Sequence, residues 1–116
     1  MPVNKQEILD EFAQLHYYYE IENEKKVICF IENNIFLLGL LVEAPIHIYR
    51  IFGKEVKLHL KLCHDAEEGW DELFIVIKSS YAPVRAVELE NELAEEWFID
   101  RMEIANGKLN FAEEPL

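Results

Sequence analysis

The chain has 116 residues, of which 51% are apolar or aromatic, and its 23 acidic and 11 basic residues give a net charge of −12. This length and apolar content suit one folded domain over residues 1–116 and exclude an intrinsically disordered chain. So acidic a chain is not expected to bind nucleic acid, because that binding requires basic residues that neutralise phosphates.

The sequence predicts a cytoplasmic protein that does not enter a membrane. The N-terminus lacks the basic and apolar pattern of a signal peptide, and the longest apolar run, residues 35–42, is far shorter than the roughly 20 residues that span a bilayer. Cys29 and Cys63 lie in apolar periodic segments. This placement favours two free thiols in a reducing compartment.

The first two segments of the chain are predicted to be helical. Apolar residues in 4–19 recur three or four positions apart, which is typical of an amphipathic helix. Asn4 followed by Glu7 resembles a capping box at its start. Residues 27–32 suit a short helix, and a strand is the alternative because Val, Ile, Cys and Phe also favour strands.

A third helix is predicted over residues 35–52, ending at Gly53. Pro45 interrupts its pattern. Because proline has no amide hydrogen, the Leu41 carbonyl loses its helical partner, and the helix should kink or restart near residues 43–44.

Two strands follow. Residues 56–63 alternate between apolar and polar positions, as a strand with one buried face does. Residues 73–78 differ, because Phe74 and Val76 make their second face apolar as well. A polar loop over residues 64–71 separates the two strands.

The last helix is predicted from apolar residues three or four positions apart, and a short strand over residues 108–111 follows it. The apolar residues are Ala86, Leu89, Leu93 and Trp97. The fold class is therefore α+β in two layers, with N-terminal helices followed by β-β-α-β and a small three-stranded mixed sheet. We expect residues 56–63 in the middle of this sheet and the last strand parallel to the second.

The acidic residues are concentrated in the second part of the chain. Residues 65–116 hold 14 acids and 4 bases, whereas residues 1–64 hold 9 acids and 7 bases. One interpretation is a solvated surface that keeps the protein soluble. The other is an acidic face at Glu88, Glu92 and Glu95 that binds a basic protein partner.

No residue pattern indicates catalysis, a cofactor or a metal. Cys63, His64 and Asp65 are adjacent, but zinc sites usually contain spaced pairs of Cys or His, and no such pair is present. The four glycines never form a phosphate-binding loop. Enzyme activity is therefore the less favoured interpretation. In this alternative, the protein binds a small molecule or is an enzyme, with a site on the sheet face near His59, Cys63 and Trp70.

The apolar second face of residues 73–78 predicts self-association. Phe74 and Val76 need a cover that the predicted helices do not supply, and a second copy related by a two-fold axis is the commonest cover. His59, Cys63 and Phe111 are expected to border this patch. The competing arrangement is a monomer in which the N-terminal helix covers that face.

Several segments of the chain resemble a set of small uncharacterised prokaryotic α+β proteins over about residues 25–112. These segments are ENNIFL at 32–37, EA at 43–44, FG at 52–53, ELF at 72–74, EEWF at 95–98 and GKLN at 107–110. The set is loosely associated with HEPN-type neighbours, so the resemblance implies an antitoxin-like pairing and transfers no site residue. In EEWF, Trp97 is expected in the core while Glu95 and Glu96 face water. The function expected is a non-catalytic protein-interaction module.

Overall fold

The computed structural model describes residues 5–116 and confirms the α+β class. The role expected of Asn4 as a helix cap lies outside these residues. The elements are α1 (Lys5–Tyr18), β1 (Tyr19–Ile21), α2 (Glu24–Asn33), α3 (Leu37–Phe52), β2 (Lys57–Asp65), β3 (Trp70–Ser79), α4 (Pro83–Leu93), α5 (Met102–Ala105) and β4 (Leu109–Pro115). Between α4 and α5 the chain continues through a π turn (Ala94–Phe98) and a 3-10 turn (Ile99–Arg101).

The sheet has four strands in the order β1-β2-β3-β4, not the three that were predicted. Strand β1 is missing from the prediction because three residues are too few to show alternation, and they directly follow a helix. β1 pairs in parallel with β2, β2 antiparallel with β3, and β3 in parallel with β4. The last strand is thus parallel to its predecessor, as predicted.

The expected position of residues 56–63 between the other two predicted strands is wrong. Strand β3 lies between β2 and β4, and β2 is internal only because β1 covers its other edge. The two apolar faces of β3 are the physical reason, because an interior strand has neighbours on both sides and is shielded from water more than an edge strand. Residues 27–32, for which helix and strand were both open, belong to helix α2, with Val27 and Ile31 buried.

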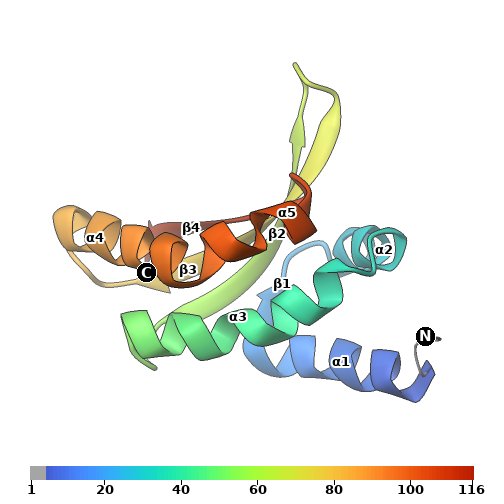
Figure 1. Ribbon diagram of the computed structural model, residues 1–116, viewed down its shortest axis with the longest axis horizontal. Helices are drawn as coiled ribbons and strands as arrows, with labels where there is room; N and C mark the ends of the chain where they lie inside the picture. The colour runs from blue at the N-terminus through green and yellow to red at the C-terminus, as the bar shows by residue number, and fades with distance from the viewer. Residues whose placement is uncertain (1–4) are drawn as a thin grey trace.

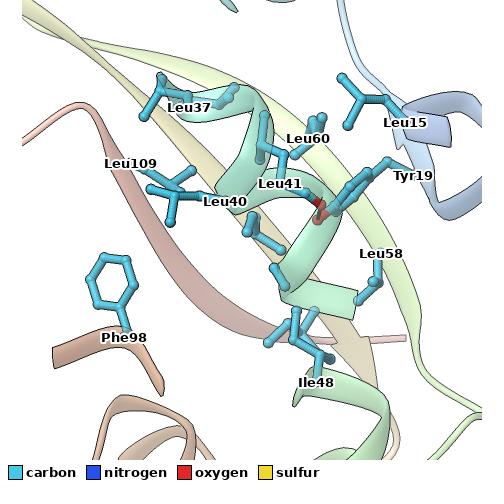
Figure 2. Close-up of a cluster of buried hydrophobic side chains, with 14 of the residues drawn as sticks. Leu15, Tyr19, Leu37, Leu40, Leu41, Ile48, Leu58, Leu60, Phe98 and Leu109 are labelled. Atoms are coloured by element: carbon cyan, nitrogen blue, oxygen red, sulfur yellow. Dashed lines mark hydrogen bonds between the residues drawn. The ribbon is translucent and has the colours of Figure 1, made fainter. Parts of the chain in front are cut away.

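The helices cover one face of the sheet. In Figure 1, α3 and α4 lie in front of the strands. The core combines buried residues of α3, such as Leu41 and Ile48, with Leu60 of β2 and Ile75 of β3. Figure 2 shows part of this cluster. The outer end of the β2–β3 hairpin projects beyond the helices (Figure 1).

Helix α3 runs through Pro45 as one element, so the expected restart near residues 43–44 does not occur. The Leu41 carbonyl, which loses the amide of Pro45, accepts a hydrogen bond from the Tyr19 hydroxyl at 2.6 Å (Figure 2). Tyr19 therefore supplies the donor that the proline removes, and the buried carbonyl stays paired.

Within residues 5–116, no single helix is long and apolar enough to cross a membrane. Helices α2 and α3 pass that criterion only as a pair, and they are bent by 116° relative to each other.

Candidate interaction surface

The face of the sheet opposite the helices, here called the open face, carries the predicted self-association patch. Strand register defines it, because directly paired residues point to the same side of a sheet. Its residues are Glu20 of β1; Lys57, His59, Lys61, Cys63 and Asp65 of β2; Trp70, Glu72, Phe74, Val76 and Lys78 of β3; and Asn110, Ala112 and Glu114 of β4. Figure 1 shows the helices on the other side of the strands.

The centre of the open face is apolar and shielded by its neighbours. Val76 is only 2% exposed. It lies outside the core cluster beneath the helices, and its direct partners on the open face are His59 and Ala112. Phe74, one pair further along, is half-buried. In the apolar strip formed by Val76 and Phe74, side chains of the sheet itself already cover Val76, so the expectation that it needs an external cover is wrong. Phe74 is covered only in part.

Charged residues of both signs surround this strip. Together with Glu22, which contacts the His59 ring at 3.6 Å, the face holds four glutamates, one aspartate and three lysines, a formal charge of −2. His59 also contacts Glu20 at 3.4 Å, and Lys78 pairs with Glu114 at 3.3 Å. The chain as a whole has a charge of −12. The open face is therefore much closer to neutrality than the rest of the surface.

The β4 edge of the sheet is poorly suited to adding another strand. At the other edge β1 pairs only with Leu58, His59 and Leu60, so within the described chain no strand covers residues 61–65 of β2. Edge strand β1 is only three residues long. On β4, the Phe111 amide donates to the Asn110 side chain at 2.8 Å. The Glu113 amide donates to the Glu90 carboxylate. The next residue on the same outward side, Pro115, has no amide hydrogen. Short edges and occupied donors are how proteins prevent edge-to-edge pairing.

Four of the five residues predicted at the interface lie on the open face: His59, Cys63, Phe74 and Val76. The expected position of Phe111 is wrong. The parallel register pairs Phe111 with Ile75, which points toward the helices, and its ring contacts that of Phe98 with centroids 5.3 Å apart. The sequence could not show this, because a one-residue change of register moves a side chain to the other face.

The residues of the alternative small-molecule site share the open face but do not converge. His59, Cys63 and Trp70 belong to three different pairs of the β2–β3 ladder, and on the open face the Lys61–Phe74 pair lies between those of His59 and Cys63. A hollow of about 380 Å³ is lined by Cys63, Glu72 and Phe74 together with the hairpin, and neither His59 nor Trp70 lines it. In the described part of the chain, no group of three His, Cys, Asp or Glu is arranged to hold a metal ion.

The predicted acidic face is exposed on α4 and the turn that follows it. Glu88, Glu92 and Glu95 point away from the buried side of α4, and Glu88 pairs with Arg85 at 3.1 Å. A basic protein partner for this face stays a prediction.

A side-chain cluster around Glu43 is the main polar feature that the sequence did not reveal. Glu43 Oε1 accepts from Trp97 Nε1 at 2.8 Å and from an Arg101 amino group at 2.7 Å. His47, four residues further along α3, lies 3.4 Å from the same oxygen and stacks on Trp97 with ring centroids 5.6 Å apart. The spacing of Glu43 and His47 is visible in the sequence, but Trp97 and Arg101 are more than fifty positions away.

The cluster keeps Glu43 ionised. Partial burial of the carboxyl acts to raise its pKa, but the hydrogen bonds from Arg101 and Trp97 and the charges of Arg101 and His47 outweigh burial, so the pKa lies below its ordinary value. The carboxylate thereby fastens the π turn to α3. Trp97 is 1% exposed while Glu95 and Glu96 face water, which confirms the arrangement expected for EEWF.

Comparison of the chain with protein-family models, with curated proteins and with solved structures returns no match.

Proposed function

We propose that this protein is a non-catalytic protein-interaction module that self-associates through the open face of its sheet. The observation that carries the proposal is a sheet covered by helices on one side only, whose other side presents the partly exposed Phe74 ring on a surface with a formal charge of only −2. Apolar strips of this kind on soluble domains usually mark contacts.

Two physical arguments favour a second copy as the occupant of this face. Two chains of charge −12 repel each other, and the repulsion is smallest where the facing surfaces are close to neutral. The blocked edge of β4 disfavours a dimer made by strand addition there, and the partly exposed Phe74 ring favours packing of face on face. A two-fold axis then covers both copies at once.

The proposed dimer leaves the acidic face on the outside. Glu88 and Glu92 on α4 and Glu95 on the π turn lie in the helical layer, so they remain exposed when two open faces pack together. An antitoxin-like role, in which the dimer presents this face to a basic protein, is a further part of the proposal and rests on the sequence resemblance.

Light scattering of the purified protein tests the dimer. One chain has a mass of 13.7 kDa, so we expect roughly twice that mass at tens of micromolar protein. Phe74→Glu should give monomers, because the substitution buries a carboxylate without a partner at the interface. A wild-type mass of one chain would overturn the proposal.

Phe36→Glu is the matched control. Phe36 is also a partly exposed phenylalanine, but it lies at the start of α3, away from the sheet. This variant should remain a dimer, and circular dichroism should show that both variants keep their secondary structure. Equal loss of the dimer in both variants would contradict an interface on the open face.

A further inference from the structure

The arrangement of four residues on the open face defines how two copies meet; this inference rests on the dimer proposed above. Lys61 pairs directly with Phe74, and Cys63 pairs directly with Glu72. The four side chains therefore mark the corners of a quadrilateral on one side of the sheet. Lys61 and Glu72 occupy one diagonal, and Phe74 and Cys63 occupy the other.

The two charged corners have no partner within the described chain. Neither Lys61 nor Glu72 forms an ion pair or a side-chain hydrogen bond among residues 5–116. Burial, and secondarily the charge of Asp65, raises the pKa of Glu72, as happens when a carboxylate lacks a nearby cation. Elsewhere on the face Lys78 pairs with Glu114, and Glu20 and Glu22 contact His59, whereas Lys57 forms no such pair within the described residues.

The two uncharged corners suit positions on a symmetry axis. Phe74 and Cys63 are half-buried and line the hollow of about 380 Å³ next to the hairpin. In a face-to-face dimer the two-fold axis runs between the sheets and parallel to both. A residue on this axis meets its own copy, and residues on either side of the axis exchange places.

Four orientations of the axis relative to the quadrilateral can be compared. An axis along the strands places Lys61 over Phe74, and an axis across the strands places Lys61 over Cys63. An axis along the Lys61–Glu72 diagonal places like charges over each other, which is repulsive. An axis along the Phe74–Cys63 diagonal alone brings opposite charges together, and it does so twice.

We propose that the dimer axis follows the Phe74–Cys63 diagonal, so that Lys61 of each copy pairs with the partner's Glu72. Phe74 then stacks against the partner's Phe74 at the centre of the interface, and Cys63 faces the partner's Cys63. Aromatic residues at the centre and charged pairs around them are the usual anatomy of a protein interface.

Complementation between two charge-reversed variants tests this arrangement. In K61E both members of each pair are carboxylates, and in E72K both are ammonium groups. Each variant alone should therefore dimerise at least about tenfold more weakly than wild type. A one-to-one mixture restores two opposite-charge pairs between different chains, so it should form heterodimers of nearly wild-type affinity. An ion pair within one chain cannot produce this rescue.

Cross-linking through Cys63 is an independent readout. A short bis-maleimide should link two copies of a Cys29→Ser protein, because the two Cys63 thiols face each other. The control is Cys63→Ser, whose remaining Cys29 lies on α2, on the helical side of β2. It should stay unlinked.

The outcomes separate this inference from the proposed function. A wild-type dimer whose two variants show no rescue on mixing, or whose Cys63 thiols do not cross-link, overturns the Phe74–Cys63 axis and leaves the dimer standing. A monomeric wild-type protein overturns both.

Discussion

At the scale of single residues, the hydroxyl of Tyr19 explains how proline is tolerated inside α3. Pro45 removes an amide in the middle of a helix whose inner side is buried. The Leu41 carbonyl would then lack a donor, and an unpaired buried carbonyl is costly. Burial raises the pKa of Tyr19 well above its ordinary value, so the hydroxyl remains protonated and donates throughout the physiological range.

We expect Tyr19→Phe to lower the free energy of unfolding by about 1–3 kcal/mol, because it keeps the ring and leaves the Leu41 carbonyl unpaired. Urea denaturation followed by circular dichroism measures this change. Tyr17→Phe is the control: Tyr17 is 83% exposed, and its variant should match wild type within about 0.5 kcal/mol. Equal stability of both variants would show that the Tyr19 hydroxyl does not support the helix.

At the scale of elements, the Glu43 cluster joins α3 to the π turn. A π turn inserts an additional residue into a helix, and it changes the direction of the side chains that follow. Here Trp97 and Arg101 both reach Glu43. The segment EEWF therefore lies where hydrogen bonds to Glu43 connect the C-terminal helical stretch to α3.

Glu43→Gln should destabilise the protein at pH 7 and make little difference at low pH. Because the folded protein depresses the pKa of Glu43 below 4.5, its ordinary value, the ionised carboxylate stabilises the fold above that pH. This contribution is lost as pH falls through the folded pKa, so the stability gap between wild type and variant should close there. Thermal unfolding measured from pH 7 to pH 3 tests the trend.

Glu96→Gln is the matched control for this pH series. Glu96 pairs with Arg50 at 3.1 Å, but both side chains are about half exposed, and exposed pairs contribute little. Its stability gap should be small at every pH. A Glu43→Gln gap that stays constant with pH would contradict a role for the charge of Glu43.

At the scale of the whole molecule, charge divides the surface into two sides. The open face has a formal charge of −2, so most of the net charge of −12 lies elsewhere, including the exposed side of α4. This division allows one side to meet a second copy of the chain while the other side stays solvated.

Reversal of Glu88, Glu92 and Glu95 to Lys tests this division of charge between the two sides of the molecule. Three reversals change the charge by three times +2, from −12 to −6. The dimer dissociation constant should then stay the same or fall, because α4 lies outside the interface and the repulsion between copies decreases. Analytical ultracentrifugation at low salt measures it. A clear rise would place α4 within the interface and contradict dimerisation through the open face.

The sequence by itself determined the α+β class, the principal helices and strands, and the parallel return of the last strand. These features depend on local periodicity and on the handedness of crossover connections, both of which are present in a single chain. The burial of Trp97 was also determined by the sequence, because a large apolar side chain at helical spacing has few alternatives to burial.

Only the tertiary structure decided which residues lie together. Strand β1 forms because β2 offers it a free edge, and the face that Phe111 occupies depends on its register with β3. Trp97 and Arg101, which donate to Glu43, and Tyr19, which donates to the Leu41 carbonyl, lie 22 to 58 positions from their acceptors in the chain. Periodicity describes one element at a time, whereas register and packing depend on how several elements meet, so these positions become defined only when the chain folds.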